Sequence, residues 1–139
     1  MSQPLRSATK DAAATTAASV GERFARALAA KDRAALIALL ADPVDFQALT
    51  PRRHWQAATP GAVVDDVILG TWFDEADDIE AVLALSNSRL PGRERVSYLL
   101  RVRNAAGAHL VEQQVYYNAE GGRISWLRVL CSGYQPVPG

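Results

Sequence analysis

The feature that most constrains the fold is a long alternation of apolar and polar residues in the second half of the sequence. It occurs in four stretches, at residues 78–90, 95–103, 109–119 and 123–133. A repeat of two residues is typical of β-strands that bury one face. The connections between these stretches carry turn-forming residues at Pro91-Gly92, Asn104 to Gly107, and Gly121-Gly122. We therefore expect four consecutive strands in an antiparallel meander.

The alternation also predicts which side chains face inward. Stretch 78–90 has Ile79, Ala81, Leu83 and Leu85 on one face, and stretch 95–103 has Val96, Tyr98, Leu100 and Val102. In the third stretch one face holds Val111, Gln113, Val115 and Tyr117, and the other holds Leu110, Glu112, Gln114 and Tyr116. The first set is more apolar, so it is expected to face the interior with Gln113 as its lone polar group. A bulge near Gly121 would exchange the two sets.

The first half of the chain reads mainly as helices. A first amphipathic helix is expected from Val20, and Asp32 is a candidate N-cap for a second, "RAALIALLA", that ends before Pro43. Residues 44–49 alternate as a strand, and residues 52–58 suit a second strand or its continuation. Thr59-Pro60 opens a third helix, with Val64, Ile68 and Trp72 on one stripe.

Helices that precede most of the strands indicate an α+β domain with its helices packed on one face of a sheet. At 139 residues the chain has the size of one domain. Residues 1–15 have little to bury and are expected to be frayed or disordered, which leaves 16–139 as a single domain.

Composition excludes several classes of partner. The formal net charge is zero, with no basic run of the kind that nucleic acid requires. One cysteine and two histidines offer neither an internal disulfide nor a closely spaced metal cluster, so we expect no metal and no cofactor. The start of the chain lacks a signal-peptide core, and no run is long enough to span a membrane. A soluble cytoplasmic protein is the expectation.

Two segments resemble a known superfamily. "AAKDRAALIALLADPVDF" is a helix that turns into a first strand, and "YYNAEGGRISWLRVL" is a hairpin whose turn keeps Gly122-Arg123-Ile124, with Gly121 where the family has an acidic residue. With the order of elements from Val20 to Gly133, they resemble the nuclear transport factor 2-like (NTF2-like) superfamily. That superfamily includes ketosteroid isomerases, SnoaL-like cyclases and limonene-epoxide-type hydrolases.

The resemblance implies a cone-like curved antiparallel sheet with three N-terminal helices packed on its concave face. It further implies a pocket between the sheet and the helices, and a homodimer formed through the outer face of the sheet. Fold alone does not fix function, because this superfamily contains enzymes, transport factors and subunits without chemistry of their own.

The isomerases' active-site positions can be carried over residue by residue. Their tyrosine on the first helix falls near Phe24, which has no hydroxyl. Their carboxylate on the early strand corresponds to Asp45 or Gln47, and alternation turns both away from the apolar side of that strand. Their second acid falls on the strand of Gln113 and Gln114, which are amides and cannot serve as general acids. The resemblance therefore implies no intact isomerase site.

The catalytic sets of the epoxide hydrolases and the cyclase-like enzymes are incomplete as well. The hydrolases need an Asp-Arg-Asp set, but Arg101 shares its polar face with Arg95 and Arg103, and no aspartate lies on the last two strands. The cyclase-like enzymes commonly use a His/Asp pair, and His109 has no acidic residue in the neighbouring strand. No catalytic set is complete in this sequence.

Apolar pockets with a few polar groups are the usual small-molecule sites, although aromatic residues also dominate ordinary cores. Our candidate ligand-binding residues are Phe24, Phe46, Trp55, Trp72, Tyr98, Gln113 and Tyr117. We expect a protein that binds a small apolar molecule between the helices and the sheet. The alternatives are a cyclase, isomerase or epoxide-hydrolase-type enzyme on a hydrophobic substrate, or a non-enzymatic dimeric interaction subunit.

Three further features have functional and structural interpretations. "DEADD" at 74–78 lacks the spacing and central glycine of a calcium loop, which favours a solvated loop. His54 is either an acid or base at the pocket mouth or an exposed histidine at the rim. Cys131 is either a nucleophile, if a base lies beside it, or a buried structural thiol.

Overall fold

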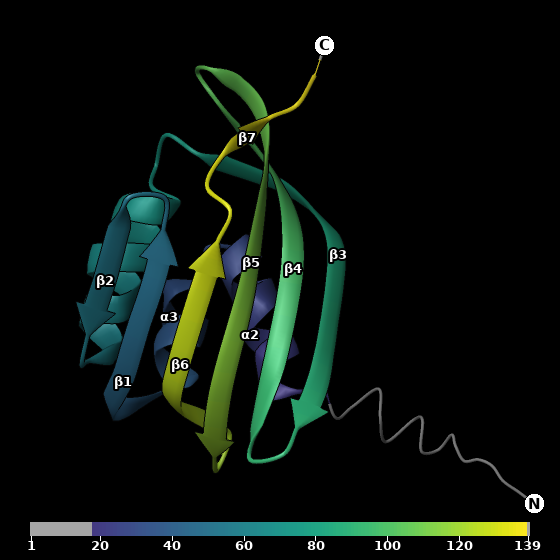
Figure 1. Cartoon of the computed structure of the whole chain (residues 1–139). Coiled ribbons are helices and arrows are strands. Elements are labelled where there is room, and N and C mark those ends of the chain that lie inside the picture. The colour runs from purple at the N-terminus through teal and green to yellow at the C-terminus, as the bar shows by residue number, and fades with distance from the viewer. Residues whose placement is uncertain (1–17, 139) are drawn as a thin grey trace, which may run out of the picture.

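The computed structural model describes residues 18–138 of the chain, as a curved seven-stranded sheet with helices on one side (Figure 1). The expectation for residues 1–15 lies outside the described residues. Among residues 18–138, no helix is both long enough and apolar enough to cross a membrane.

The first two helices begin where the sequence predicts them, the first at Val20 and the second directly after Asp32. Helix α2 spans Val20–Ala29, and its N-cap Ser19 accepts a hydrogen bond through Oγ from Glu22 N at 3.0 Å. Helix α3 spans Arg33–Ala38 and is capped by Asp32, which accepts from Ala35 N at 3.1 Å. The predicted second helix was too long, because strand β1 already begins at Leu40.

The third predicted helix is present, but it is a π-helix, η1, over Ala62–Trp72. Phe73 N donates to Ile68 O at 2.8 Å, and Thr71 Oγ1 donates to Asp66 O at 2.8 Å. Its apolar stripe is buried as expected, including Val64, Ile68 and Trp72. π-Helical turns are rare and occur often at functional sites, and η1 ends beside the site described below.

The strands are β1 Leu40–Thr50, β2 Arg53–Ala57, β3 Asp78–Leu90, β4 Arg93–Asn104, β5 Gly107–Glu120, β6 Arg123–Cys131 and β7 Gln135–Pro136. The sheet order is β2-β1-β6-β5-β4-β3, with β7 paired to β5. The prediction of a purely antiparallel sheet was wrong, because β1 runs parallel to β6. Only two of the three helices precede β1 among the described residues, since η1 follows β2.

The helices and the inward-facing side chains of the sheet form one core. Helix α2 contacts β3, β4 and β5, whereas α3 and η1 contact each other and reach β1 and β2 respectively. The predicted inward sets of β4 and β5 are buried, including Tyr98 and Gln113. The register shift between β5 and β6 lies at Asn118/Ala119, beyond Tyr117, so it leaves the face of Gln113 unchanged.

The predicted face of β3 was wrong at its centre. Register shifts between Ile79 and Ala81 and between Val82 and Ala84 change which side chains point inward. As a result Val82 packs against the core, and Leu83 is exposed.

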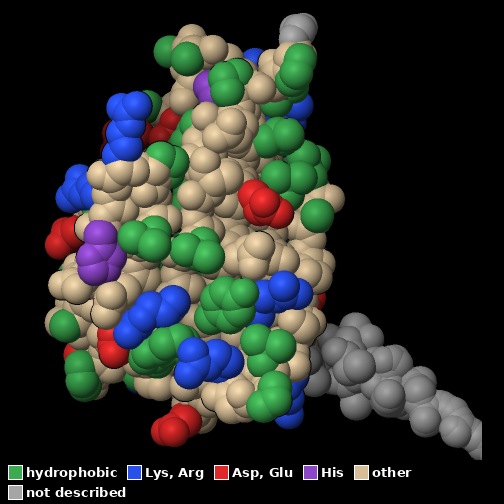
Figure 2. Space-filling view, viewed as in Figure 1, with side chains coloured by type: hydrophobic (Ala, Val, Ile, Leu, Met, Phe, Trp, Pro, Cys, Tyr) green, Lys and Arg blue, Asp and Glu red, His purple; other side chains and the backbone are tan. Residues whose placement is uncertain are grey.

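The outer face of the sheet is turned toward the viewer in Figure 2. Lys and Arg side chains gather there around hydrophobic ones (Figure 2). The guanidinium groups of Arg93 and Arg128 both stack on the Trp126 ring, at 4.3 and 4.4 Å from its centroid. Leu49 and Leu130 are register partners on β1 and β6.

Candidate functional site

A cavity of about 210 Å³ lies where the end of η1, strands β5 and β6 and the C-terminal segment meet. Its lining comprises Thr50, Pro51, Thr71, Trp72, Phe73, Gln113, Cys131, Gly133 and Tyr134. Two residues of the predicted ligand-binding set, Trp72 and Gln113, are among them. No side chain in this lining carries a formal charge at neutral pH.

Gln113 supplies the first distinctive polar group of the cavity. Its side chain is 0% exposed, and its Oε1 accepts a hydrogen bond from the Tyr98 hydroxyl at 2.7 Å. Burial raises the pKa of the Tyr98 hydroxyl, which therefore stays protonated and able to donate. With Oε1 engaged, the amide is oriented, and its Nε2 has no hydrogen-bond partner within the described part of the chain. A buried N–H of this kind is costly to leave unpaired, so it is a candidate ligand contact.

Trp72 supplies the second distinctive polar group of the cavity, its indole N–H. Trp72 is 8% exposed, and its ring packs against the rings of Phe46 and Trp55, each with its centroid 6.0 Å away. The Trp55 indole donates from Nε1 to Thr50 Oγ1 at 2.8 Å, whereas Trp72 Nε1 is buried without a partner among residues 18–138. The two indoles thus differ in a way that matters for binding, because only that of Trp72 has a free donor.

The C-terminal segment closes one side of the cavity. The Tyr134 hydroxyl donates to the Trp72 carbonyl oxygen at 2.7 Å, which ties the segment to the end of η1. Burial, followed by the nearby Asp77 carboxylate, raises the pKa of this hydroxyl, so it also stays protonated. Behind it the buried His109 ring packs edge-on against the Tyr134 ring, with centroids 5.5 Å apart.

Cys131 lies directly across the strands from Gln113. The two residues are register partners on β6 and β5, so they share the inward face of the sheet. The thiol is free and half-buried, and Gly133 N donates to its Sγ at 3.4 Å. The prediction of a buried structural thiol is therefore wrong about the burial of Cys131, which is half-buried and lines the cavity.

The arrangement can recognise a hydrogen-bond acceptor. The hydroxyls of Thr50, Thr71 and Tyr134 are already engaged with other protein groups. This leaves two unpartnered N–H donors, one on Gln113 and one on Trp72, in an otherwise mostly apolar lining. Within the described residues no group of three or more His, Cys, Asp or Glu side chains is placed to hold a metal ion.

The remaining candidate residues lie elsewhere. Phe24 is buried in the core on α2, and Tyr98 contributes through its bond to Gln113. Phe46 and Trp55 contribute through their ring contacts with Trp72.

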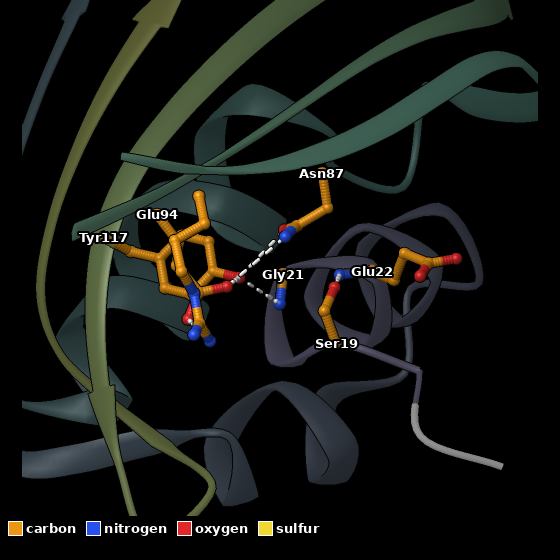
Figure 3. A network of polar contacts seen from close by, with 7 residues as sticks. Ser19, Gly21, Glu22, Asn87, Glu94 and Tyr117 are labelled. Carbon is orange, nitrogen blue, oxygen red and sulfur yellow. Dashed lines mark hydrogen bonds and ion pairs between the residues drawn. The ribbon is translucent and has the colours of Figure 1, made fainter. Parts of the chain in front are cut away.

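Tyr117 belongs to a separate polar network at the start of α2 (Figure 3). Its hydroxyl accepts from Gly21 N at 2.9 Å and donates to Asn87 Oδ1 at 2.8 Å, with Glu94 Oε1 at 3.1 Å. Burial raises its pKa. A Cβ on Gly21 would lie 2.6 Å from that hydroxyl, so only glycine permits this close approach. The network anchors α2 to the sheet and does not contribute to the cavity.

The polar residues weighed as catalytic candidates lie outside the cavity. Asp45 is 57% exposed and binds Arg128 at 3.0 Å, and His54 bonds Gln47 Oε1 at 3.0 Å on the exposed surface. On the polar face of β4, Arg101 and Arg103 bind Glu80.

In the "DEADD" loop the backbone carbonyl oxygens of Asp74 and Asp77 accept hydrogen bonds from Lys31 Nζ. Asp74 Oδ1 also accepts from Ala76 N at 2.9 Å. The loop is therefore tied to the turn after α2 through its backbone.

Sequence reasoning did not assign Tyr134 or Gly133 to the site. Gly133 is the final residue of the last predicted strand, and Tyr134 follows it in a segment with no periodic pattern. Cys131 could have been found, because it continues the inward alternation of Leu127 and Val129.

Comparisons with known proteins identify the fold. No protein-family model matches the sequence, and no curated protein matches it significantly. Among solved structures, a candidate isomerase from Rhodopseudomonas palustris superposes with a TM-score of 0.64 at 15% identity, covering 84% of this chain and 91% of that one. An LEH-like epoxide hydrolase from M. tuberculosis gives 0.61 at 11% identity, covering 81% and 80%. An NTF2-like protein from Burkholderia thailandensis gives 0.60 at 14% identity, covering 81% and 88%. The protein therefore has the NTF2-like superfamily fold, as the sequence resemblance implied.

Proposed function

We propose that the protein binds a small, neutral, largely apolar molecule in the cavity between η1, β5 and β6, through one acceptor oxygen. The observation that carries this proposal is that Gln113 and Trp72, two residues of the same cavity lining, each have a buried N–H donor, Nε2 and Nε1, without a partner among residues 18–138. A carbonyl oxygen has two lone pairs and can accept from both donors. A cone-like enclosure of the ligand by sheet and helices, and a cytoplasmic location, are parts of the same proposal.

The lining restricts the charge of the ligand. A carboxylate would enter a cavity without Lys, Arg or His in its lining, and an amine would find no carboxylate there. Burying an unpaired charge costs far more than one hydrogen bond contributes. Neutral ketones, aldehydes, lactones and amides fit this polarity.

The volume restricts the size of the ligand. An apolar cavity of about 150 Å³ accepts benzene, and pockets for drug-sized ligands have volumes of roughly 300–1,000 Å³. At about 210 Å³ this cavity suits a molecule between a single ring and a monoterpene. A steroid is too large for it without rearrangement of the C-terminal segment.

The structural neighbours include an epoxide hydrolase and a candidate isomerase, so the alternative function is an enzyme of one of these types. General acid–base chemistry needs a titratable group within reach of the ligand. The lining offers only the Cys131 thiol and the Tyr134 phenol, and the phenol's pKa is raised. Binding is therefore the function that this cavity supports best.

The test is a calorimetric titration with cyclohexanone and larger monoterpene ketones, each paired with a hydrocarbon of the same shape. Ketones are expected to bind more tightly than their hydrocarbon partners. Gln113→Leu and Trp72→Phe should each weaken ketone binding about 2- to 10-fold, the effect of one hydrogen bond. Gln114→Leu is the matched control, because Gln114 is the neighbouring amide on the opposite face of β5. Equal affinity for ketones and hydrocarbons would refute the proposal.

We also propose a homodimer through the outer face of the sheet. Leu49 and Leu130 are 52% and 49% exposed. They are register partners on β1 and β6, so their side chains form one exposed apolar surface. Light scattering should give a dimer mass for the wild type and a monomer mass for Leu130→Asp. Leu90→Asp, at the end of β3, is the control and should remain dimeric. A monomeric wild type would refute this proposal.

A further inference from the structure

We infer that Cys131 is a nucleophile that adds covalently to α,β-unsaturated carbonyl compounds bound in the cavity. This inference rests on the proposed function, because the same two donors hold the carbonyl oxygen. It assigns a reactive role to the only cysteine of the chain.

The geometry places the thiol and the donors around one ligand. Cys131 and Gln113 face each other across β6 and β5, and Cβ atoms of such pairs are roughly 4.5–5.5 Å apart. A carbonyl compound bound to Gln113 would therefore share one cavity with the sulfur. The second and independent observation is Gln113, a 0% exposed residue of the cavity lining, whose Nε2 is buried without a partner among residues 18–138.

The step balances without any further reactant. The sulfur forms a bond to the β-carbon, and the π electrons move onto the carbonyl oxygen, which becomes an enolate. Gln113 Nε2–H and Trp72 Nε1–H then donate to an oxygen with negative charge, and such hydrogen bonds are stronger than those to a neutral carbonyl. The proton lost by the thiol is returned to the α-carbon, so the product is the saturated thioether.

The surroundings of the sulfur are compatible with this role. The thiol is half-buried and belongs to the cavity lining, and Gly133 N donates a hydrogen bond to its sulfur at 3.4 Å. The hydroxyls of Tyr98 and Tyr134 are engaged in donating to Gln113 Oε1 and the Trp72 carbonyl, so they hold the two donor residues in place.

The experiment is intact-protein mass spectrometry after incubation with cyclohex-2-en-1-one. A single cysteine makes the site of a one-adduct mass increase unambiguous, and Cys131→Ser must abolish it. Methyl methanethiosulfonate, which has no carbonyl, measures thiol access alone. The ratio of the enone rate to the methanethiosulfonate rate should exceed the same ratio for glutathione by about tenfold or more, since one oxyanion donor contributes on the order of 10²–10³ in rate.

Variants distinguish a rate increase caused by the N–H donors of Gln113 and Trp72 from one caused only by the accessibility of the Cys131 thiol. Gln113→Leu and Trp72→Phe should each lower the rate ratio about tenfold or more, whereas Gln114→Leu should leave it unchanged. A wild-type ratio equal to that of glutathione would overturn the inference, as would a thiol that neither reagent reaches. Binding of cyclohexanone to Cys131→Ser distinguishes the two proposals. If cyclohexanone binds and the enone forms no adduct, the binding function stands and the covalent step is refuted.

Discussion

Variants of the buried pair Tyr98 and Gln113 should change the unfolding free energy in opposite directions, depending on whether one partner or both are replaced. Tyr98 is 2% exposed and Gln113 0% exposed, so removing one partner leaves the other as a buried polar group without its 2.7 Å hydrogen bond. Tyr98→Phe leaves the Gln113 amide with both polar atoms unpartnered, and we expect a loss of about 1–3 kcal/mol of unfolding free energy. Gln113→Leu removes an unsatisfied N–H but leaves the Tyr98 hydroxyl unpaired, so its net effect should be smaller.

The double variant Tyr98→Phe, Gln113→Leu removes every unpartnered polar atom of the pair. Replacing both members of a buried hydrogen bond by apolar groups can be neutral or stabilising. We expect it to be at least as stable as the wild type, while it should bind ketones about 2- to 10-fold more weakly, as Gln113→Leu does. Guanidinium unfolding of the four proteins gives the coupling energy, which should be about 1–3 kcal/mol for residues in direct contact. A coupling near zero, or a double variant less stable than either single variant, would refute the account of this pair.

Two further predictions concern the helix anchor and the surface ion pairs. Gly21→Ala should lower the unfolding free energy by about 1–3 kcal/mol, the cost of overpacking, because its Cβ would press on the Tyr117 hydroxyl. The control is Gly61→Ala, whose Cβ would meet nothing within 4 Å. Thermal unfolding should show little loss of stability for this control. The pKa of Glu80 is lowered by Arg103 and then Arg101, so the ion pairs contribute stability above the unfolded pKa of the carboxyl and lose it as pH falls through the lower folded pKa. Glu80→Gln should therefore be slightly less stable than the wild type at pH 7 and equal to it near pH 2 in chemical unfolding; a difference that persists at pH 2 would contradict this.

The strands could be predicted because alternation is a local property of the sequence. It identified β4 and β5 and put Gln113 on the inward face. The parallel pairing of β1 with β6 joins segments about 80 residues apart, and neither segment carries a pattern that specifies its partner. The face of β3 was misassigned because its bulges depend on pairing with β4, which no local pattern reports.

The site was predictable only in part, for a similar reason. Trp72 and Gln113 could be predicted as inward-facing from periodicity, but only the fold shows that they line one cavity. Tyr134 lies in the aperiodic C-terminal segment and could not be assigned. Tyr117 was inward-facing as predicted, yet the close approach of Gly21 gives it a partner on α2 instead.

The central claim is that the cavity binds a neutral carbonyl compound through the donors of Trp72 and Gln113. Nuclear magnetic resonance of the three indole N–H groups during titration with cyclohexanone tests it most directly, with assignments from single Trp→Phe variants. We predict a saturable downfield shift of the Trp72 Nε1–H signal. The Trp55 signal, already hydrogen-bonded to Thr50, and that of Trp126 on the outer face should stay nearly constant. A Trp72 signal that does not move, or shifts no larger than those of Trp126, would contradict the account.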